Sequence, residues 1–224
     1  MYLVRVVVIA LLCGVMSGGC ATSQPTATVQ VAPTVPIPGP EEKWREIALS
    51  DDAQTLDSID QRWQQALATL GPTTRKSAEA EGALLDPAAA LDHPAPTPGS
   101  YKCRVVRLQM DERPARRLRA YPEFFCYIRA EGDQLTFLKQ TGTDLPAGWL
   151  FPGGPRRIVF LGAQQDEPGE GKLGYGVERA RDRAGVIERI GPFRWRLAMA
   201  VTGDAQRFDI YEFRPVPSDA QPEV

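Results

Sequence analysis

The sequence predicts an α+β protein in which N-terminal helices pack on a small antiparallel β-barrel, or a strongly curved sheet, of about eight strands. Apolar residues recur at helical spacing in residues 41–98, and the period changes to two from Gly99 onward. Short alternating segments separated by turn residues continue over residues 99–216, which is typical of antiparallel barrels. We expect both parts to fold as one unit of this 224-residue chain.

The helices are predicted from the positions of their apolar residues and end signals. Apolar residues at steps of three and four indicate a helix from Ser50 to Leu70, with two aspartates after Ser50 facing the positive end of its dipole. Gly71-Pro72 is expected to end this helix. A second helix is predicted over 74–85, and a short helical piece around Trp44.

Alternating apolar and polar residues predict the strands. Glu131-Gly132-Asp133 and Gly191-Pro192 supply turn residues between neighbouring segments. The predicted strands are 101–109, 124–129, 135–137, 157–163, 172–177, 184–190, 193–201 and 206–214.

The charges are divided between the two parts of the chain. Residues 41–100 carry 11 Asp or Glu and 5 Lys or Arg, which gives a net charge of −6. Residues 101–214 carry 15 Asp or Glu and 20 Lys or Arg, which gives a net charge of +5. Opposite charges favour association, so we expect the helices to pack against the barrel, where they could close one end. The net charge of −2 for the whole chain gives no indication of nucleic-acid binding.

The first twenty residues have the composition of a secretory signal peptide. Arg5 precedes an apolar run from Val6 to Met16, which is shorter than the roughly 20 residues that span a bilayer, although an uncleaved anchor is an alternative. Residues 21–40, uncharged and rich in Pro, Thr and Ala, are predicted to form an extended tether. Residues 217–224 are predicted to be a disordered tail.

The segment Gly18-Gly19-Cys20-Ala21 resembles the lipobox of bacterial lipoproteins, although Ser17 stands where that motif prefers leucine. The resemblance implies that Cys20 is lipidated and becomes the first residue of the mature protein. It also implies a periplasmic protein anchored to the outer membrane, since Ala21 is not the aspartate that retains lipoproteins in the inner membrane. Ordinary cleavage after Ala21 is the alternative.

Cys103 and Cys126 are the cysteines that remain beyond the signal region. In an oxidising compartment they are expected to form a disulfide, and the predicted positions on the apolar faces of two strands make a cross-strand bridge feasible. Closing such a loop contributes on the order of 3 kcal/mol of stability. Two buried free thiols are the alternative interpretation.

Several short segments carry a resemblance to a known family. They are Glu81–Pro87, Tyr101–Arg104, Tyr121-Pro122 followed by Cys126, Lys139–Gly142, Val159–Gly162, and Gly185–Pro192 leading into Trp195–Leu197. Together they resemble a bacterial family of exported proteins, catalogued as domain of unknown function 4893. The resemblance covers roughly residues 44–215 and supports the export and the cysteine pair, but it implies no activity. The chain departs from the family pattern at Thr143–Pro146, where a more polar segment with a basic residue is expected.

Catalytic and metal chemistry have few candidate residues. His93, the one histidine, lies in a proline-rich connector, which is a poor place to hold a general base. One histidine and an oxidised cysteine pair leave too few ligands for zinc, and no phosphate-binding glycine loop precedes a helix, so we expect no metal and no cofactor. Asp182 and Glu188 are candidate acids for glycoside hydrolysis, without a diagnostic spacing.

Arginine is the most unusual residue, with 21 Arg against 5 Lys, and it is frequent in the strand region. Bidentate contacts to an anionic glycan, a lipid head group or an acidic protein would use such residues, whereas compositional bias and solvated strand faces are the alternative. The frequent strand-region arginines are Arg156, Arg157, Arg179, Arg181, Arg183, Arg189, Arg194 and Arg196. We predict a ligand-binding surface at Arg157, Tyr175, Arg189, Arg194 and Arg196.

The sequence thus favours a non-catalytic binding or interaction module of the cell envelope, tethered to a membrane through Cys20. Its partner would be an envelope protein or an anionic ligand. An acid-catalysed hydrolase of envelope polysaccharide is the alternative function. An apolar, closed barrel interior would favour the binding module, and a cleft with two facing carboxylates would favour the hydrolase.

Overall fold

The computed structural model describes residues 42–167, 174–201 and 203–217, which all belong to one compact unit. The predicted signal peptide, the tether with Cys20, and the tail beyond Pro217 lie outside the described residues.

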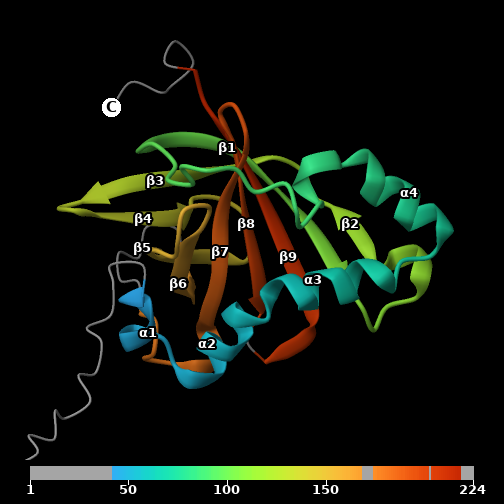
Figure 1. Cartoon of the computed structure of the whole chain (residues 1–224), viewed down its shortest axis with the longest axis horizontal. Helices are drawn as coiled ribbons and strands as arrows, with labels where there is room; N and C mark the ends of the chain where they lie inside the picture. The colour runs from blue at the N-terminus through green and yellow to red at the C-terminus, as the bar shows by residue number, and fades with distance from the viewer. Residues whose placement is uncertain (1–41, 168–173, 202, 218–224) are drawn as a thin grey trace, which may run out of the picture. The chain divides into compact units, whose positions relative to one another are not determined.

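Eight antiparallel strands close into a barrel (Figure 1). Consecutive strands pair as neighbours, and the barrel closes because β1 also pairs with β9 from Tyr101–Pro215 to Gln109–Arg207. A short extra strand, β2 (Leu118–Ala120), pairs with the C-terminal half of β1. The barrel strands are β1 (Gly99–Gln109), β3 (Phe124–Glu131), β4 (Gln134–Lys139), β5 (Leu145–Pro152), β6 (Ile158–Gln165), β7 (Asp182–Gly191), β8 (Arg194–Val201) and β9 (Asp204–Pro215).

The predicted fold class is confirmed, but strands β2 and β5 were not predicted, and the strand predicted over 172–177 was wrong. Strand β5 was not predicted, because Pro146, Gly148 and Pro152 all disfavour a strand. Conversely, residues 174–177 form a turn and not the strand predicted over 172–177. That turn extends the chain away from the barrel so that Tyr175 can reach the helices, where its hydroxyl donates to Asp52 over 2.7 Å.

The N-terminal helices are α1 (Trp44–Ile47), α2 (Ser50–Asp57), α3 (Ile59–Ala68) and α4 (Pro72–Ala80), followed by a 3₁₀ turn, η2 (Gly82–Leu84). The helix predicted from Ser50 to Leu70 is broken at Ser58, whose hydroxyl donates to the carbonyl of Gln54 over 2.8 Å. Two further 3₁₀ turns, η3 (Pro114–Arg116) and η4 (Arg179–Arg181), lie in barrel loops.

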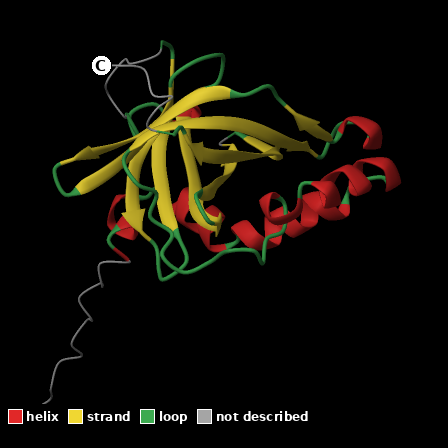
Figure 2. Cartoon of the chain, turned by 90° about the horizontal axis from the view of Figure 1, so that it is seen from above, coloured by secondary structure: helices red, strands yellow, loops and turns green. Residues whose placement is uncertain are grey.

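The apolar residues form two layers separated by the barrel wall. Inward-facing residues such as Phe137, Phe160 and Tyr211 fill the barrel interior. Outward-facing residues of β1 and β6–β9 pack against the helices, which lie along one side of the barrel (Figure 2). Trp63 of α3, for example, packs on Phe208 with ring centroids 5.5 Å apart. The helices therefore cover the outer wall of the barrel.

Ion pairs between the two parts follow the charge division of the sequence. Each joins an acid from residues 41–100 to an arginine from residues 101–214, as opposite net charges predicted. Three of the pairs are partly buried and add specificity to the apolar packing, whereas Asp92–Arg156 is exposed. The pairs are Asp52–Arg179, Asp60–Arg157, Glu81–Arg104 and Asp92–Arg156.

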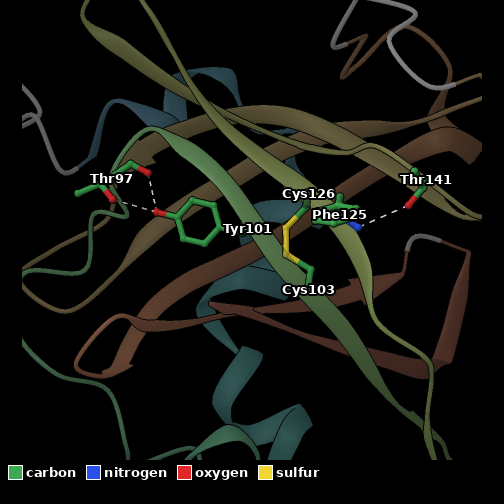
Figure 3. The surroundings of a disulfide bond; sticks show 6 residues. All are labelled: Thr97, Tyr101, Cys103, Phe125, Cys126 and Thr141. Atoms are coloured by element: carbon green, nitrogen blue, oxygen red, sulfur yellow. Dashed lines mark hydrogen bonds between the residues drawn. A yellow bond between two sulfur atoms is a disulfide. The ribbon is translucent and has the colours of Figure 1, made fainter. Parts of the chain in front are cut away.

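The disulfide lies inside the barrel (Figure 3). Cys103 of β1 and Cys126 of β3 are joined, with their Cα atoms 6.0 Å apart. The predicted disulfide is thus present. Both cysteines are at most 1 % exposed. Two residues before Cys103, the Tyr101 hydroxyl donates to the carbonyl of Thr97. This hydrogen bond fixes the orientation of the Tyr101 ring beside the disulfide. The disulfide therefore ties together two strands that share the interior core.

Candidate functional site

The best candidate site is a cluster of charged residues at the barrel end where β8 turns into β9. We call it the charged mouth. Each strand residue in it occupies the next inward-facing position beyond the apolar interior, because side chains alternate along a strand. Arg107 follows Val105 on β1, Asp209 and Arg207 continue from Tyr211 on β9, and Arg183 and Lys139 extend β7 and β4 in the same way. The charged mouth comprises Arg107, Lys139, Asp144, Arg183, Arg207 and Asp209.

Two carboxylates of the charged mouth share the same two arginines. Asp209 is fully buried and accepts from Arg107 Nε over 2.7 Å and from Arg207 Nη2 over 2.6 Å. Asp144, in the loop between β4 and β5, accepts on Oδ2 from Nη2 of Arg107 over 3.0 Å and of Arg207 over 2.9 Å. Arg107 and Asp209 are directly opposite each other on β1 and β9, so the sheet register fixes this part of the cluster.

Among the residues that the structure describes, Lys139 and Arg183 have no salt bridge to a carboxylate. Within the described residues, the Lys139 ammonium donates to the carbonyl of Thr143 and lies 4.4 Å from the ring centre of Phe124. Arg183 Nη1 donates to the carbonyl of Asp182 over 2.8 Å and to that of Ala180 over 3.3 Å. The six ionisable side chains therefore carry four positive and two negative charges.

The surroundings of Lys139 and Arg183 disfavour the charged forms of both side chains. Burial lowers the pKa of Lys139; the carboxylates of Asp144 and Asp209 oppose this effect, and the neighbouring Arg107 and Arg207 add to it. Burial, followed by repulsion from Arg207, lowers the pKa of the Arg183 guanidinium. By contrast, the two arginines outweigh burial and hold the pKa of Asp144 below its usual range. The charged mouth is thus a place where additional negative charge would be stabilised.

A hollow of about 280 Å³ opens beside Arg107. Its lining includes Arg119 and Tyr121, and the Arg107 guanidinium lies 5.1 Å from the ring centre of Tyr121. Asp111 and Glu112 lie on the same lining, and Glu112 faces Arg119 at 3.7 Å. This hollow gives a small ligand room next to the charged mouth.

The structure brings Arg157 and Arg196 together on Glu188, but it does not gather all five predicted ligand-binding residues, and most of them lie under or beside the helices. Arg196 is fully buried, with its guanidinium 4.4 Å from the ring centre of Trp63. It donates to Glu188 over 2.6 Å and to the carbonyls of Ala83 and Asp86 over 2.7 and 2.6 Å. Arg196 thereby fixes η2 on the barrel wall.

The other four predicted residues also have intramolecular partners. Arg157 pairs with Glu188 and Asp60, and Tyr175 bonds to Asp52. Arg194 shares Glu212 with Arg104 and Arg214. Arg189, towards the other end of β7, donates to the carbonyl of Asp92 over 2.6 Å. These contacts tie loops and helices to the barrel, and no single surface gathers the five residues.

The two candidate acids for hydrolysis do not face each other across a cleft. Asp182 is fully buried and accepts from the backbone amide of Gly176 over 2.8 Å and from Arg179 over 3.3 Å. Glu188, equally buried, is held by Arg157 and Arg196. His93 is exposed, with its backbone amide bonded to the carbonyl of Pro155. Each acid is thus occupied by arginines of the helix–barrel boundary.

Among the described residues, no group of His, Cys, Asp and Glu side chains has the arrangement of a metal site. No helix in the described ranges is both long and apolar enough to span a membrane.

Most of the charged mouth was missed by the sequence analysis. Arg183 was among the frequent strand-region arginines, but Arg107, Lys139 and Arg207 were not singled out. The available signal was a cation two positions beyond the apolar, inward-facing residues of a predicted strand. Asp144 lies within the segment Thr143–Pro146, where the chain departs from the family pattern.

These features define a class of protein: a closed, eight-stranded antiparallel barrel with one side covered by N-terminal helices and a charged cluster at one mouth. The chain belongs to the family described as domain of unknown function (DUF4893), whose match covers residues 44–213. This range includes all the helices, the disulfide and the charged mouth. No curated protein matches the sequence.

Proposed function

We propose that this protein is a non-catalytic binding module of the cell envelope, whose barrel mouth receives an anionic ligand or the acidic group of a partner. The observation that carries the proposal is the charge excess of the mouth, where Lys139 and Arg183 add two cations to a cluster whose carboxylates are already shared. Cationic side chains with few counterions favour anion binding, and arginine adds geometric specificity.

The barrel interior supports binding over hydrolysis. It is apolar and filled by side chains, with Phe137 stacked on Phe213 at a centroid distance of 5.2 Å. Retaining and inverting glycosidases both need two carboxyl groups that flank the scissile bond. Asp182 and Glu188 face the helices and not a shared cleft, so they do not provide such a pair.

The envelope location rests on the N-terminal sequence, through the signal-like segment and Cys20. Metabolic labelling with palmitate tests it. We expect label in the wild-type protein and none in Cys20→Ala. Label that persists in Cys20→Ala would reject lipidation at this residue, and wild-type protein recovered from the cytoplasm with residues 1–20 still attached would reject export.

Ligand binding is tested by native mass spectrometry of the protein purified from envelope extract. We expect a bound anionic species that is lost in Arg183→Gln and retained in Arg189→Gln. Both substitutions remove an arginine of β7, but Arg189 lies towards the other end of the strand and bonds to the carbonyl of Asp92. An adduct that survives Arg183→Gln, or no adduct in any variant, would count against the charged mouth as the binding site.

A further inference from the structure

We propose that the charged mouth is an oxyanion site for a compact carboxylate or phosphate group, and that Asp144 occupies it as an internal counterion that the ligand joins or displaces. The inference rests on the proposed function, because it names the class of ligand and the residue that competes with it. It is carried by the way in which the two carboxylates are held.

Asp209 and Asp144 have different roles in the cluster. Asp209 is fully buried on β9, and it accepts hydrogen bonds from both arginines, so it positions their guanidinium groups. Asp144 reaches the same arginines from a loop, and its side chain keeps 39 % of its exposure. Asp209 therefore assembles the arginine pair, which is itself mostly buried, and Asp144 contacts the same pair from the more exposed side.

The contacts of Asp144 are those that a ligand oxyanion would make. One oxygen, Oδ2, accepts from Nη2 of Arg107 and from Nη2 of Arg207. A phosphate or carboxylate oxygen prefers the same type of charge-assisted contact with arginine. Asp144 also has φ of 51°, in the left-handed region, which an aspartate adopts at a modest energetic cost. The loop conformation thus depends in part on the two arginines, and a competing anion would release it.

Two further cations face this position. Lys139 lies four residues before Thr143, and its ammonium is held by the Thr143 carbonyl in the same loop. Arg183 faces the cluster from β7, close enough to Arg207 for their repulsion to lower its pKa. Burial also raises the pKa of the Tyr211 hydroxyl, which lies in the barrel interior next to these groups and stays neutral. An oxyanion would therefore meet two cations in addition to the arginine pair, and all four cations share the two carboxylates Asp144 and Asp209.

The competing acids are few and lie to one side. Asp111 and Glu112 line the hollow next to Arg107, where Glu112 faces Arg119 and Asp111 accepts from the Gln109 amide over 2.8 Å. Neither bonds to Arg183, Arg207 or Lys139 in the described residues. The body of a ligand would occupy this hollow, with its anionic end at the charged mouth.

Isothermal titration with inorganic phosphate and with acetate tests the proposal, at constant ionic strength balanced with chloride. We expect saturable binding that becomes about tenfold tighter in Asp144→Asn, because one competing negative charge is removed. Arg183→Gln should weaken binding about tenfold, whereas the matched control Arg189→Gln should bind like the wild type. The ratio of phosphate to acetate affinity separates a phosphate-bearing from a carboxylate-bearing ligand.

Binding detected only in Asp144→Asn would still support the site, because the wild-type carboxylate would then compete too well. The proposal would be overturned by an absence of saturable binding in both the wild type and Asp144→Asn, or by equal affinities in Arg183→Gln and the wild type. The titration uses purified protein, so its outcome is independent of palmitate labelling. An anionic adduct from envelope extract that is lost in Arg183→Gln, together with no affinity for phosphate or acetate, would refute this inference and leave the proposed function in place.

Discussion

At the scale of single residues, arginine has two separate uses in this protein. Arg196 is buried with its charge balanced by Glu188 and its remaining donors bonded to backbone carbonyls of the segment Ala83–Pro87. Such a residue contributes through geometry, because a buried charge is tolerated only when its partners are complete. The arginines of the charged mouth share two carboxylates and retain excess positive charge.

We predict that Arg196→Ala destabilises the protein by about 3–5 kcal/mol, since Glu188 and several carbonyls lose a buried donor. Urea unfolding followed by circular dichroism measures the effect. The matched control is Arg194→Ala, for which we expect a loss below about 1 kcal/mol, because Glu212 keeps Arg104 and Arg214. Equal losses in the two variants would contradict this assignment.

A second residue-scale prediction concerns the glycine pair of β5 and β6. Gly148 and Gly162 are directly opposite each other, and a Cβ on Gly162 would lie 2.2 Å from the carbonyl oxygen of Ala147 and 2.7 Å from the Phe160 ring. We expect Gly162→Ala to cost at least about 1–3 kcal/mol in thermal or urea unfolding. Gly191→Ala, whose new Cβ would approach Arg194 Cβ to an ordinary 3.6 Å, should be nearly neutral. A stable Gly162→Ala would show that the two strands can separate without loss.

At the scale of elements, helices and strands whose apolar residues recur with a regular period could be predicted from the sequence. Strands with an irregular apolar pattern could not. The helices and most strands follow from apolar spacing, as does the position of the disulfide on facing strands. Strand β5 escaped prediction because its prolines and glycine hide the alternation, and its place is set by pairing with β4 and β6. The charged mouth likewise depends on register, which places Arg107 opposite Asp209 although the two residues are far apart in the sequence.

Glu212 connects three elements and predicts an acid dependence of stability. Hydrogen bonds from Arg104, Arg214 and Arg194 outweigh the burial of Glu212 and lower the pKa of its carboxyl group in the folded protein. The ionised Glu212 carboxylate therefore contributes its full stabilisation at pH values above the pKa of this group in the unfolded chain, about 4.3. The stabilisation is lost as the pH falls through the lower pKa of Glu212 in the folded protein.

We expect the free energy of unfolding to fall less steeply below about pH 4.3 in Glu212→Gln than in the wild type. Urea unfolding between neutral pH and acid measures this difference. Since Asp144 and Asp57 also have lowered pKa values, some acid dependence will persist in the variant. Parallel pH profiles for the two proteins would contradict the role assigned to Glu212.

At the scale of the whole molecule, the helices and the barrel share one apolar boundary, so we expect them to unfold together. The outer wall of β1 and β6–β9 is apolar where the helices cover it, and Arg196 and the inter-part ion pairs cross the same boundary. A barrel without its helices would expose this wall to water, and exposed apolar patches of this kind lead to association.

We predict that a chain lacking residues 42–88 aggregates or binds hydrophobic dyes, whereas the intact chain unfolds in one transition. Limited proteolysis of the intact protein should not release a stable helical fragment. Recovery of such a fragment, or a soluble and cooperatively folded barrel from residues 99–217, would contradict the single-unit description.

We propose that arginines at the helix–barrel boundary provide stability, while those at the charged mouth provide anion binding. The most direct test compares Arg157→Gln with Arg183→Gln in thermal unfolding with and without phosphate, at constant ionic strength. We expect Arg157→Gln to lower Tm and keep the phosphate-induced shift, because Arg157 pairs with Asp60 and Glu188. We expect Arg183→Gln to keep Tm and lose the shift. A wild-type shift in Arg183→Gln, or loss of the shift in Arg157→Gln, would contradict the claim.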